Sequence, residues 1–345
     1  MPSEPQAPRI LVIRRRYLGD LVLLGSVFRN LRLNEPAAHI TLLSERAFAP
    51  IGKLHLDVDQ VKVIPKSIGE WLKFWSWMRK VGFTQVLDFD NTDKTAIITR
   101  LTGAAVRVTY DRETNPFRHR WIYTGSAKVS NDFYTSQHIT ETYLKLLESV
   151  GVPVTSREIR LVPREQDLQV VKKYTRGMGP KILLHPGSRS HFRIWPIERF
   201  AAVCDYLQDE LNAQVFIVAG PGELSIAKEI QQKAEGHVVL IIEHFPIAQF
   251  AALISKFDLF LCHDSGPMHI AAGVGVPVVA LFGSQNAEIW KPVGEGHTIL
   301  QTELPCTCLP DMPIPCVKSD SYRNYCVRKL TVEEVSAALH RKLSA

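Results

Sequence analysis

Short runs rich in Ile, Leu and Val alternate with segments of helical periodicity along this chain, and the pattern occurs twice. The runs of the first half are residues 9–13, 39–43, 60–64 and 85–89. Those of the second half are residues 181–185, 214–220, 238–242, 259–263 and 278–283. Buried strands separated by helices indicate a parallel sheet with helices on both faces. The sequence therefore predicts an α/β protein in which two such units follow each other.

The length of 345 residues suits two domains of ordinary size. We expect an N-terminal domain over residues 1–163 and a C-terminal domain over residues 178–345, with a Gly- and Pro-containing linker near residues 163–180. Helical segments are expected at 21–33, 68–82, 195–211, 223–235, 247–256, 267–274 and 331–343. The last of these begins with Thr331 and Glu334 at capping-box spacing.

The start of the chain and its apolar segments indicate the cellular compartment in which we expect the protein. The first ten residues, MPSEPQAPRI, contain no apolar run, so we expect no signal peptide. No stretch approaches the roughly 20 apolar residues that span a bilayer. The expectation is a cytoplasmic protein, which can also sit on a membrane surface.

Charge is unevenly distributed. Residues 1–163 contain 23 Lys and Arg against 16 Asp and Glu, whereas the remainder contains 18 against 19. A basic first half suggests an anionic partner there, and nucleic acid, anionic lipid and a phosphorylated acceptor all fit. A solvated surface with a chance excess of cations is the alternative.

The six cysteines fall into two groups. Cys204 and Cys262 lie in apolar surroundings and are expected to be reduced core residues. Four more cluster near the end of the chain: Cys306, Cys308, Cys316 and Cys326. Without a secretory signal we expect no disulfides, and the spacing lacks the paired CxxC motifs of a zinc site. We therefore expect no metal, and the role of this cluster stays open.

Ligands of open α/β sheets bind beyond the carboxyl ends of the strands, which directs attention to four loops. In the first loop, Gly19 permits a tight turn and Asp20 follows at the expected helix start. Asp20 is either a helix cap or a carboxylate presented to a ligand. The loop is not the GxGxxG of dinucleotide binders, which disfavours a dehydrogenase.

The loop after the strand at 259–263 reads DSGPMH. Ser265 and Gly266 suit a helix start, and such a start offers free N–H groups and a dipole to a phosphate. Asp264 can accept hydrogen bonds from sugar hydroxyls. His269, one turn into the helix, is either a ligand contact or a buried structural histidine.

The remaining two loops also carry polar groups. Ser188 and Arg193 lie in a loop whose glycine, serines and arginines suit a diphosphate, although the arginines could equally be surface residues. Glu223 follows a Gly-Pro-Gly turn at a strand end, where a carboxylate often binds ribose hydroxyls. Its alternative is a cap on the next helix.

Three segments together resemble glycosyltransferase family 9, the bacterial heptosyltransferases that build the inner core of lipopolysaccharide. They are RRRYLGDLVLLGSVFRNL, HPGS…RIWP and HDSGPMHIAAGVGVPVVALFGS…IWKPVG. The resemblance covers nearly the whole chain and looks closest to the heptosyltransferase III branch, which adds the third inner-core heptose.

The resemblance implies a GT-B architecture, in which two Rossmann-like domains face each other across a cleft. It implies an inverting, metal-independent transfer from ADP-L-glycero-D-manno-heptose, with no cofactor. The acceptor is expected on the first domain and the donor on the second, in a protein at the cytoplasmic face of the inner membrane.

Carried over position by position, the resemblance assigns Asp20 as the catalytic base. Arg193 matches a basic residue that is often Lys in the family, and Glu223 matches the nucleotide-binding carboxylate only loosely. The residues that match the donor-sugar and diphosphate motif are Asp264, Ser265, Gly266 and His269.

The basic first half then has a candidate partner in the anionic lipopolysaccharide core. Arg16, Arg118 and Arg120 are the expected acceptor contacts, and no nucleic-acid motif accompanies the basic residues. In the expected helix at 68–82, the spacing places Trp71 and Trp75 on one face with Trp77 turned away. Packing against the sheet is expected for most of these three tryptophans.

Two other functions remain open at this stage. One is transfer of a different nucleotide-sugar on the same fold, because a fold does not fix its donor. The other is a non-catalytic nucleotide- or phosphosugar-binding protein, which the Gly19–Asp20 pair argues against because a pure binder needs no base.

Overall fold

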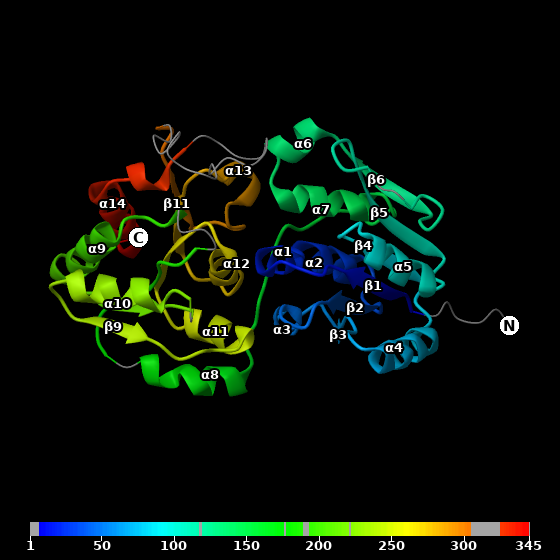
Figure 1. Ribbon diagram of the computed structural model, residues 1–345, viewed down its shortest axis with the longest axis horizontal. Helices are drawn as coiled ribbons and strands as arrows, with labels where there is room; N and C mark the ends of the chain where they lie inside the picture. The colour runs from blue at the N-terminus through cyan, green and yellow to red at the C-terminus, as the bar shows by residue number, and fades with distance from the viewer. Residues whose placement is uncertain are drawn as a thin grey trace. The chain divides into compact units, whose positions relative to one another are not determined.

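Figure 1 presents the computed structural model, which describes residues 7–116, 119–175, 177–188, 193–220, 222–304 and 325–344. The chain divides into two compact units, Met1–Val162 and Pro163–Ala345. Each unit carries one six-stranded parallel sheet with helices packed on it, so the expected α/β class with two sheets is confirmed.

The sheet of the first unit has the order β3-β2-β1-β4-β5-β6. Its strands are β1 (Arg9–Ile13), β2 (His39–Ser44), β3 (Gln60–Val63), β4 (Gln85–Asp88), β5 (Val106–Arg112) and β6 (Gly125–Val129). Its helices are α1 (Leu18–Leu23), α2 (Gly25–Asn34), α3 (Ala49–Gly52), α4 (Ile68–Val81), α5 (Asp93–Leu101), α6 (Asn131–Ser136) and α7 (Ile139–Glu148). The central strand β1 is apolar and buried because helices cover both faces.

The sheet of the second unit has the order β12-β11-β10-β7-β8-β9. Its strands are β7 (Lys181–His185), β8 (Gln214–Val218), β9 (Val238–Ile241), β10 (Leu259–His263), β11 (Val278–Phe282) and β12 (Thr298–Gln301). Its helices are α8 (Glu165–Val171), α9 (Ile197–Asp209), α10 (Leu224–Lys233), α11 (Ile247–Ile254), α12 (Gly266–Gly273), α13 (Ala287–Trp290) and α14 (Val332–Leu343).

Both sheets follow the Rossmann strand order, in which the third, second and first strands precede the fourth, fifth and sixth. The chain reverses its direction of winding between β1 and β4 in the first unit and between β7 and β10 in the second. Loops diverge at such a switch point and leave room for a ligand beyond the strand ends. Each unit therefore has one favoured place for a site.

The predicted strands are confirmed to within a few residues, but three strands escaped prediction. β5 and β12 are only partly buried at most positions, and β6 (GSAKV) contains few large apolar residues. Edge position in the sheet explains why β6 and β12 lack the continuous apolar run of a buried strand.

Two expectations about helices are corrected. The segment expected to be one helix at 21–33 is two helices, α1 and α2, which meet at Leu24. The backbone packs closely at the start of α2, because a Cβ atom on Gly25 would lie 2.9 Å from Ile159 Cγ2. The expected linker near 163–180 contains α8, which packs against α11 of the second unit.

The capping box at Thr331 is confirmed, because the Glu334 carboxylate accepts from the Thr331 N–H at 2.7 Å. Among the described residues, no helix has the length and apolar character to cross a bilayer.

Candidate active site

Asp20 lies at the switch point of the first unit, directly after β1. Helix α1 has Tyr17 as its N-cap, so Asp20 is the third helical residue and not the capping residue. Its Oδ2 nevertheless accepts the Tyr17 N–H at 3.1 Å, which satisfies a free donor of the helix start. The carboxylate thus caps the helix from inside the first turn. The two roles considered for Asp20, helix cap and ligand contact, do not exclude each other.

The other carboxylate oxygen of Asp20 has two strong donors. Arg14 Nη2 and the Tyr143 hydroxyl donate to Oδ1 at 2.6 Å and 2.5 Å. The Asp20 side chain is only 9% exposed, so these charge-assisted bonds form largely away from water. Oδ2, with a single N–H donor among the described residues, keeps capacity to accept another hydrogen bond.

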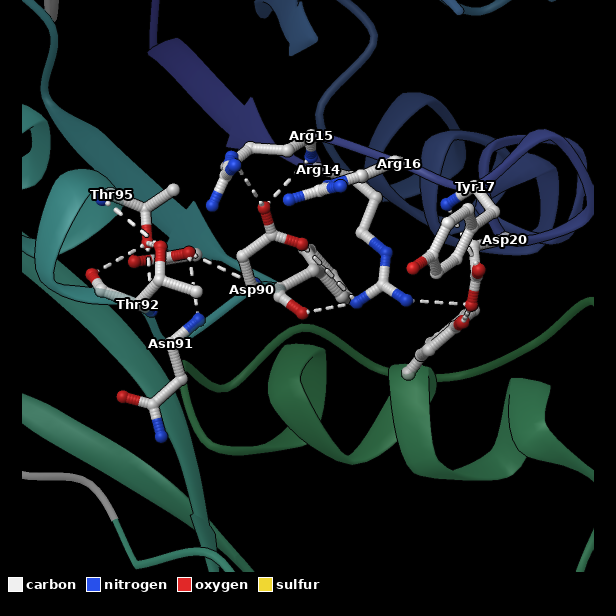
Figure 2. Close-up of polar contacts among 12 residues, drawn as sticks. Arg14, Arg15, Arg16, Tyr17, Asp20, Asp90, Asn91, Thr92 and Thr95 are labelled. Atoms are coloured by element: carbon white, nitrogen blue, oxygen red, sulfur yellow. Dashed lines mark hydrogen bonds and ion pairs between the residues drawn. The ribbon is translucent and has the colours of Figure 1, made fainter. Parts of the chain in front are cut away.

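Arg14 connects Asp20 to the loop after β4, as Figure 2 shows. Its Nη1 donates to the Phe89 carbonyl at 2.6 Å and lies 3.5 Å from Asp90 Oδ1. Burial lowers the pKa of Arg14, but Tyr143, Asp20 and Asp90 outweigh burial and leave that pKa above its ordinary value. Arg14 is therefore a permanent cation between two carboxylates.

Asp90 is a buried carboxylate that the sequence interpretation missed. Its Oδ2 accepts the Arg15 N–H at 2.9 Å, and burial raises its pKa to about 6 although Arg14 opposes the shift. A carboxyl group whose pKa is raised by burial and that lies at a switch point is a candidate functional group. Its position just after the predicted strand at 85–89 was the available signal, since ligands meet strand ends.

Asp88, two residues earlier, has a structural role. One oxygen accepts the Tyr123 hydroxyl at 2.7 Å, and the other accepts the N–H groups of Asp90 and Asn91 at 3.0 Å and 3.3 Å. The side chain is fully buried, and burial raises its pKa. These bonds fix the turn that presents Asp90.

The three arginines predicted to contact the acceptor have different outcomes. Arg16 is half exposed in the same loop as Asp20 and lies 3.6 Å from Glu45. Arg120 is exposed and lies 3.7 Å from Asp111, near the end of β5. Arg118 lies outside the described residues.

In the second unit, His185 and Glu223 meet at the ends of β7 and β8. His185 Nε2 lies 3.3 Å from Glu223 Oε2, which also accepts the Gly220 N–H at 3.1 Å. The hydrogen bond from His185 holds the pKa of Glu223 below its ordinary value. Glu223 occupies the N-cap position of α10, but its side chain makes no capping bond and points to His185 instead.

A glycine makes this arrangement possible. A Cβ atom on Gly187 would overlap the Glu223 carboxylate, so only glycine fits at this position without a shift of Glu223. The Gly187 carbonyl also lies 3.4 Å from His263 Nδ1. The loop after β7 is thereby tied to both β8 and β10.

His263 is a buried structural histidine. Its Nε2 accepts the Trp195 N–H at 2.9 Å, so the proton of the neutral ring belongs on Nδ1. Burial lowers its pKa to about 4. This contact anchors the end of the loop that contains Arg193, two residues before Trp195.

Arg193 and Asp264, both predicted to contact the donor, lie together at the switch point of the second unit. Arg193 Nη1 is 3.8 Å from Asp264 Oδ2, and both side chains are mostly buried. Ser265 is the N-cap of α12, and its buried Oγ has no hydrogen-bond partner among the described residues. A buried hydroxyl without a partner at a helix start is a group that a bound ligand can satisfy.

The other predicted donor residues lie in the same two loops. Gly266 is the first residue of α12, and His269 is buried one turn further on. Ser188 follows Gly187 and is half-buried. The structure therefore brings the predicted donor residues to the strand ends of one sheet.

The cysteine cluster is described only in part. Cys326 is buried, while Cys306, Cys308 and Cys316 lie outside the described residues. Cys204 and Cys262 are buried reduced thiols, as predicted, and burial raises the pKa of both. Within the described ranges, no three His, Cys, Asp or Glu side chains are grouped to hold a metal ion.

Sequence relatives of the chain are glycosyltransferases. A model of glycosyltransferase family 9 (heptosyltransferase) matches residues 71–319. Lipopolysaccharide core heptosyltransferase OpsX of Haemophilus influenzae is 24% identical over 83% of this chain and 82% of that protein. Lipopolysaccharide heptosyltransferase 3 of Escherichia coli is 26% identical over 80% of this chain and 83% of that protein.

Solved structures share the fold. The family 9 glycosyltransferase from Veillonella parvula aligns with a TM-score of 0.80 at 21% identity, covering 99% of this chain and 98% of that one. The E. coli ADP-heptose lipopolysaccharide heptosyltransferase II aligns with a TM-score of 0.78 at 19% identity, covering 97% and 98%. This likeness confirms the expected GT-B architecture of two Rossmann-like domains.

Proposed function

Because the chain belongs to glycosyltransferase family 9, the heptosyltransferase family, we propose that it transfers heptose from ADP-heptose to the inner core of lipopolysaccharide. The printed functions of its relatives, lipopolysaccharide heptosyltransferases from several bacteria, support this acceptor class. The ADP-heptose in the name of heptosyltransferase II supports the donor. The observation that carries the proposal is the buried Asp20 carboxylate at the switch point of the first unit, fixed by Arg14 and Tyr143.

Asp20 is the proposed general base. An acceptor hydroxyl is a poor nucleophile near neutral pH, and a positioned carboxylate that takes its proton accelerates attack about 10²–10⁴-fold. Two donors hold Oδ1, so Oδ2 is the oxygen with capacity to receive the proton. The acceptor oxygen forms its bond to the anomeric carbon as the bond to the diphosphate breaks, which inverts the configuration.

The second unit is proposed to hold the donor and stabilise the leaving group. ADP leaves with negative charge on its diphosphate, and a cation with a helix start stabilises such charge. Arg193 and the start of α12 at Ser265 supply these groups without a metal ion. Asp264 is assigned to hydroxyls of the donor sugar because its negative charge would repel the diphosphate.

Glu223 is proposed to bind ribose hydroxyls of the nucleotide. His185 lies against one carboxylate oxygen and favours its ionised form. An ionised carboxylate accepts hydrogen bonds but donates none, which matches the two hydroxyl donors of a ribose. The buried Nδ1 of His185 has no partner among the described residues and can join the same contact.

The acceptor side is proposed to lie on the first unit, with Arg16 and Arg120 contacting the anionic core. Arg118 is retained as a third contact on sequence grounds alone. Since lipopolysaccharide carries a lipid, the enzyme would work at the cytoplasmic face of the inner membrane. Membership of the third-heptose branch stays a prediction from the sequence.

A donor screen tests the proposal. Purified protein is mixed with a heptose-deficient core acceptor and with ADP-heptose, ADP-glucose, UDP-sugars or GDP-sugars in turn, and products are identified by mass spectrometry. Transfer from ADP-heptose alone, unchanged by EDTA, is the expected result. Transfer from another donor, with none from ADP-heptose, would replace the proposed sugar while leaving the fold and family intact.

A further inference from the structure

Helix α4 has an inner face that packs on the sheet of the first unit. Phe74 and Met78 are buried in the core cluster beside strands β1 and β4. Trp71 and Trp77 flank Phe74, with ring centroids 5.8 Å and 5.3 Å from it. The expected pairing of Trp71 with Trp75 was therefore wrong, because Trp71 and Trp77 both turn inward around Phe74.

The outer face of α4 exposes large apolar side chains. Ile68, Leu72 and Trp75 are 82%, 61% and 42% exposed. Their spacing of four and three residues places them on one stripe of the helix. Leu72 and Trp75 also line a shallow groove of about 470 Å³, together with Ser76, Arg79 and Lys80. The core of the unit leaves this stripe without a partner among the described residues.

Cations flank the exposed stripe. Residues 60–82 contain five Lys and Arg against one acidic residue, Glu70. Glu70 is engaged by Arg46 at 3.1 Å and by the Lys66 N–H at 2.7 Å, so its charge is compensated. The exposed cations on the helix itself are Lys73, Arg79 and Lys80.

We propose that the outer face of α4 docks on an anionic lipid surface. An apolar stripe that ends in a tryptophan and is bordered by Lys and Arg is the pattern of a helix lying in a membrane interface. Anionic headgroups attract the basic residues, while the apolar side chains enter the acyl boundary. A protein partner would also cover an apolar stripe, but the surplus of uncompensated cations favours the lipid.

The inference rests on the proposed function for its biological sense, because a lipopolysaccharide acceptor is held in a membrane. Its test does not use that acceptor. The full chain is sedimented with vesicles of phosphatidylglycerol and phosphatidylcholine, and with vesicles of phosphatidylcholine alone, at low and high salt. We expect binding to the anionic vesicles that weakens as salt screens the charges.

Variants assign the binding to the helix face. The double variant Leu72→Ser/Trp75→Ser is expected to lower vesicle affinity about tenfold or more, because it removes exposed apolar groups. Arg79→Glu/Lys80→Glu is expected to abolish the preference for anionic lipid and serves if the first variant folds poorly. Trp121→Ser is the matched control, since Trp121 is 74% exposed elsewhere in the unit.

Three results would overturn the proposal: no binding to anionic vesicles, binding that the α4 variants retain, or equal loss in Trp121→Ser. Transfer to a lipid-free core oligosaccharide separates this proposal from the proposed function. The α4 variants should keep that activity at the parental level, and a parent that binds vesicles without any transfer would leave the docking face standing.

Discussion

At the scale of single residues, several polar groups of the first unit hold the Asp20 carboxylate in place. Asp20 accepts hydrogen bonds from the Arg14 guanidinium, the Tyr143 phenol and the Tyr17 N–H, and Tyr143 lies 123 positions away in the chain. Such donors fix the direction of the carboxylate before a substrate arrives, which is the usual function of the groups around a catalytic residue. We therefore propose Tyr143 and Arg14 as positioning residues for Asp20.

Removal of the Tyr143 hydroxyl tests that role. Tyr143→Phe keeps the ring and deletes one donor to Asp20, so we expect kcat to fall about tenfold or more while KM for the donor stays within about twofold. Tyr123→Phe, which deletes a buried hydroxyl bonded to Asp88, is the control for stability. Equal kinetics in both variants would count against positioning by Tyr143.

The raised pKa of Asp90 leads us to expect that the stability of the protein depends on pH. Burial raises its pKa from 3.8 to about 6, so the folded protein keeps a proton that the unfolded chain has lost. Stability therefore falls as pH rises from about 4 to about 6, by up to about 3 kcal/mol for two pKa units. Asp90→Asn lacks this titration, so its free energy of unfolding relative to the parent should rise over that range.

Urea denaturation at pH 4, 5, 6 and 7 measures this difference. Asp209→Asn, an exposed aspartate at the end of α9, controls for the loss of a negative charge. A difference between Asp90→Asn and the parent that stays constant with pH would show that Asp90 does not titrate differently in the folded protein.

Arg193 tests the assignment of the diphosphate. Arg193→Ala should raise KM for the donor at least about tenfold and leave KM for the acceptor within about twofold, because the lost cation is proposed to contact the donor and not the acceptor. Arg193→Lys retains the charge and should recover part of the loss. A variant that loses acceptor affinity instead would remove Arg193 from the donor site.

At the scale of elements, the loop after β7 and the start of α10 fit together through a glycine. Gly187 leaves the space that the Glu223 carboxylate fills beside His185. The contact joins the ends of β7 and β8, which lie next to each other in the sheet. The geometry of the proposed ribose contact therefore depends on a residue that has no side chain.

Gly187→Ala should displace Glu223 and weaken ADP binding about tenfold, measured by calorimetry, because the new methyl group occupies the position of the carboxylate. Gly222→Ala is the control, because a Cβ there has no contact within 4 Å among the residues that the structure describes. Unchanged ADP affinity in Gly187→Ala would mean that the Glu223 position is irrelevant to the nucleotide.

The sequence was informative where a pattern is local. Buried strands such as β1 and β10 consist of continuous apolar runs, so they could be predicted, and strand ends then located Asp20, Arg193 and Asp264. Contacts between distant residues could not be predicted. Tyr143 reaches Asp20 across 123 positions of the chain, and no periodicity encodes that pairing.

At the scale of the whole molecule, one design appears twice. Each unit is a parallel sheet in Rossmann order, and each has polar residues gathered at its switch point. The first unit offers an anchored carboxylate and carries the surplus of positive charge, whereas the second offers a cation and a helix start. We propose that the first unit provides the base and the acceptor site and that the second unit binds the donor.

The most direct test of this division compares donor binding with transfer in Asp20→Asn. Calorimetry gives ADP affinity, and single-turnover transfer from ADP-heptose gives the chemical step. We expect ADP affinity within about twofold of the parent and a transfer rate lower by about 10² or more. Near-normal transfer, or a loss of ADP affinity as large as the loss of rate, would contradict the proposed division of roles between the two units.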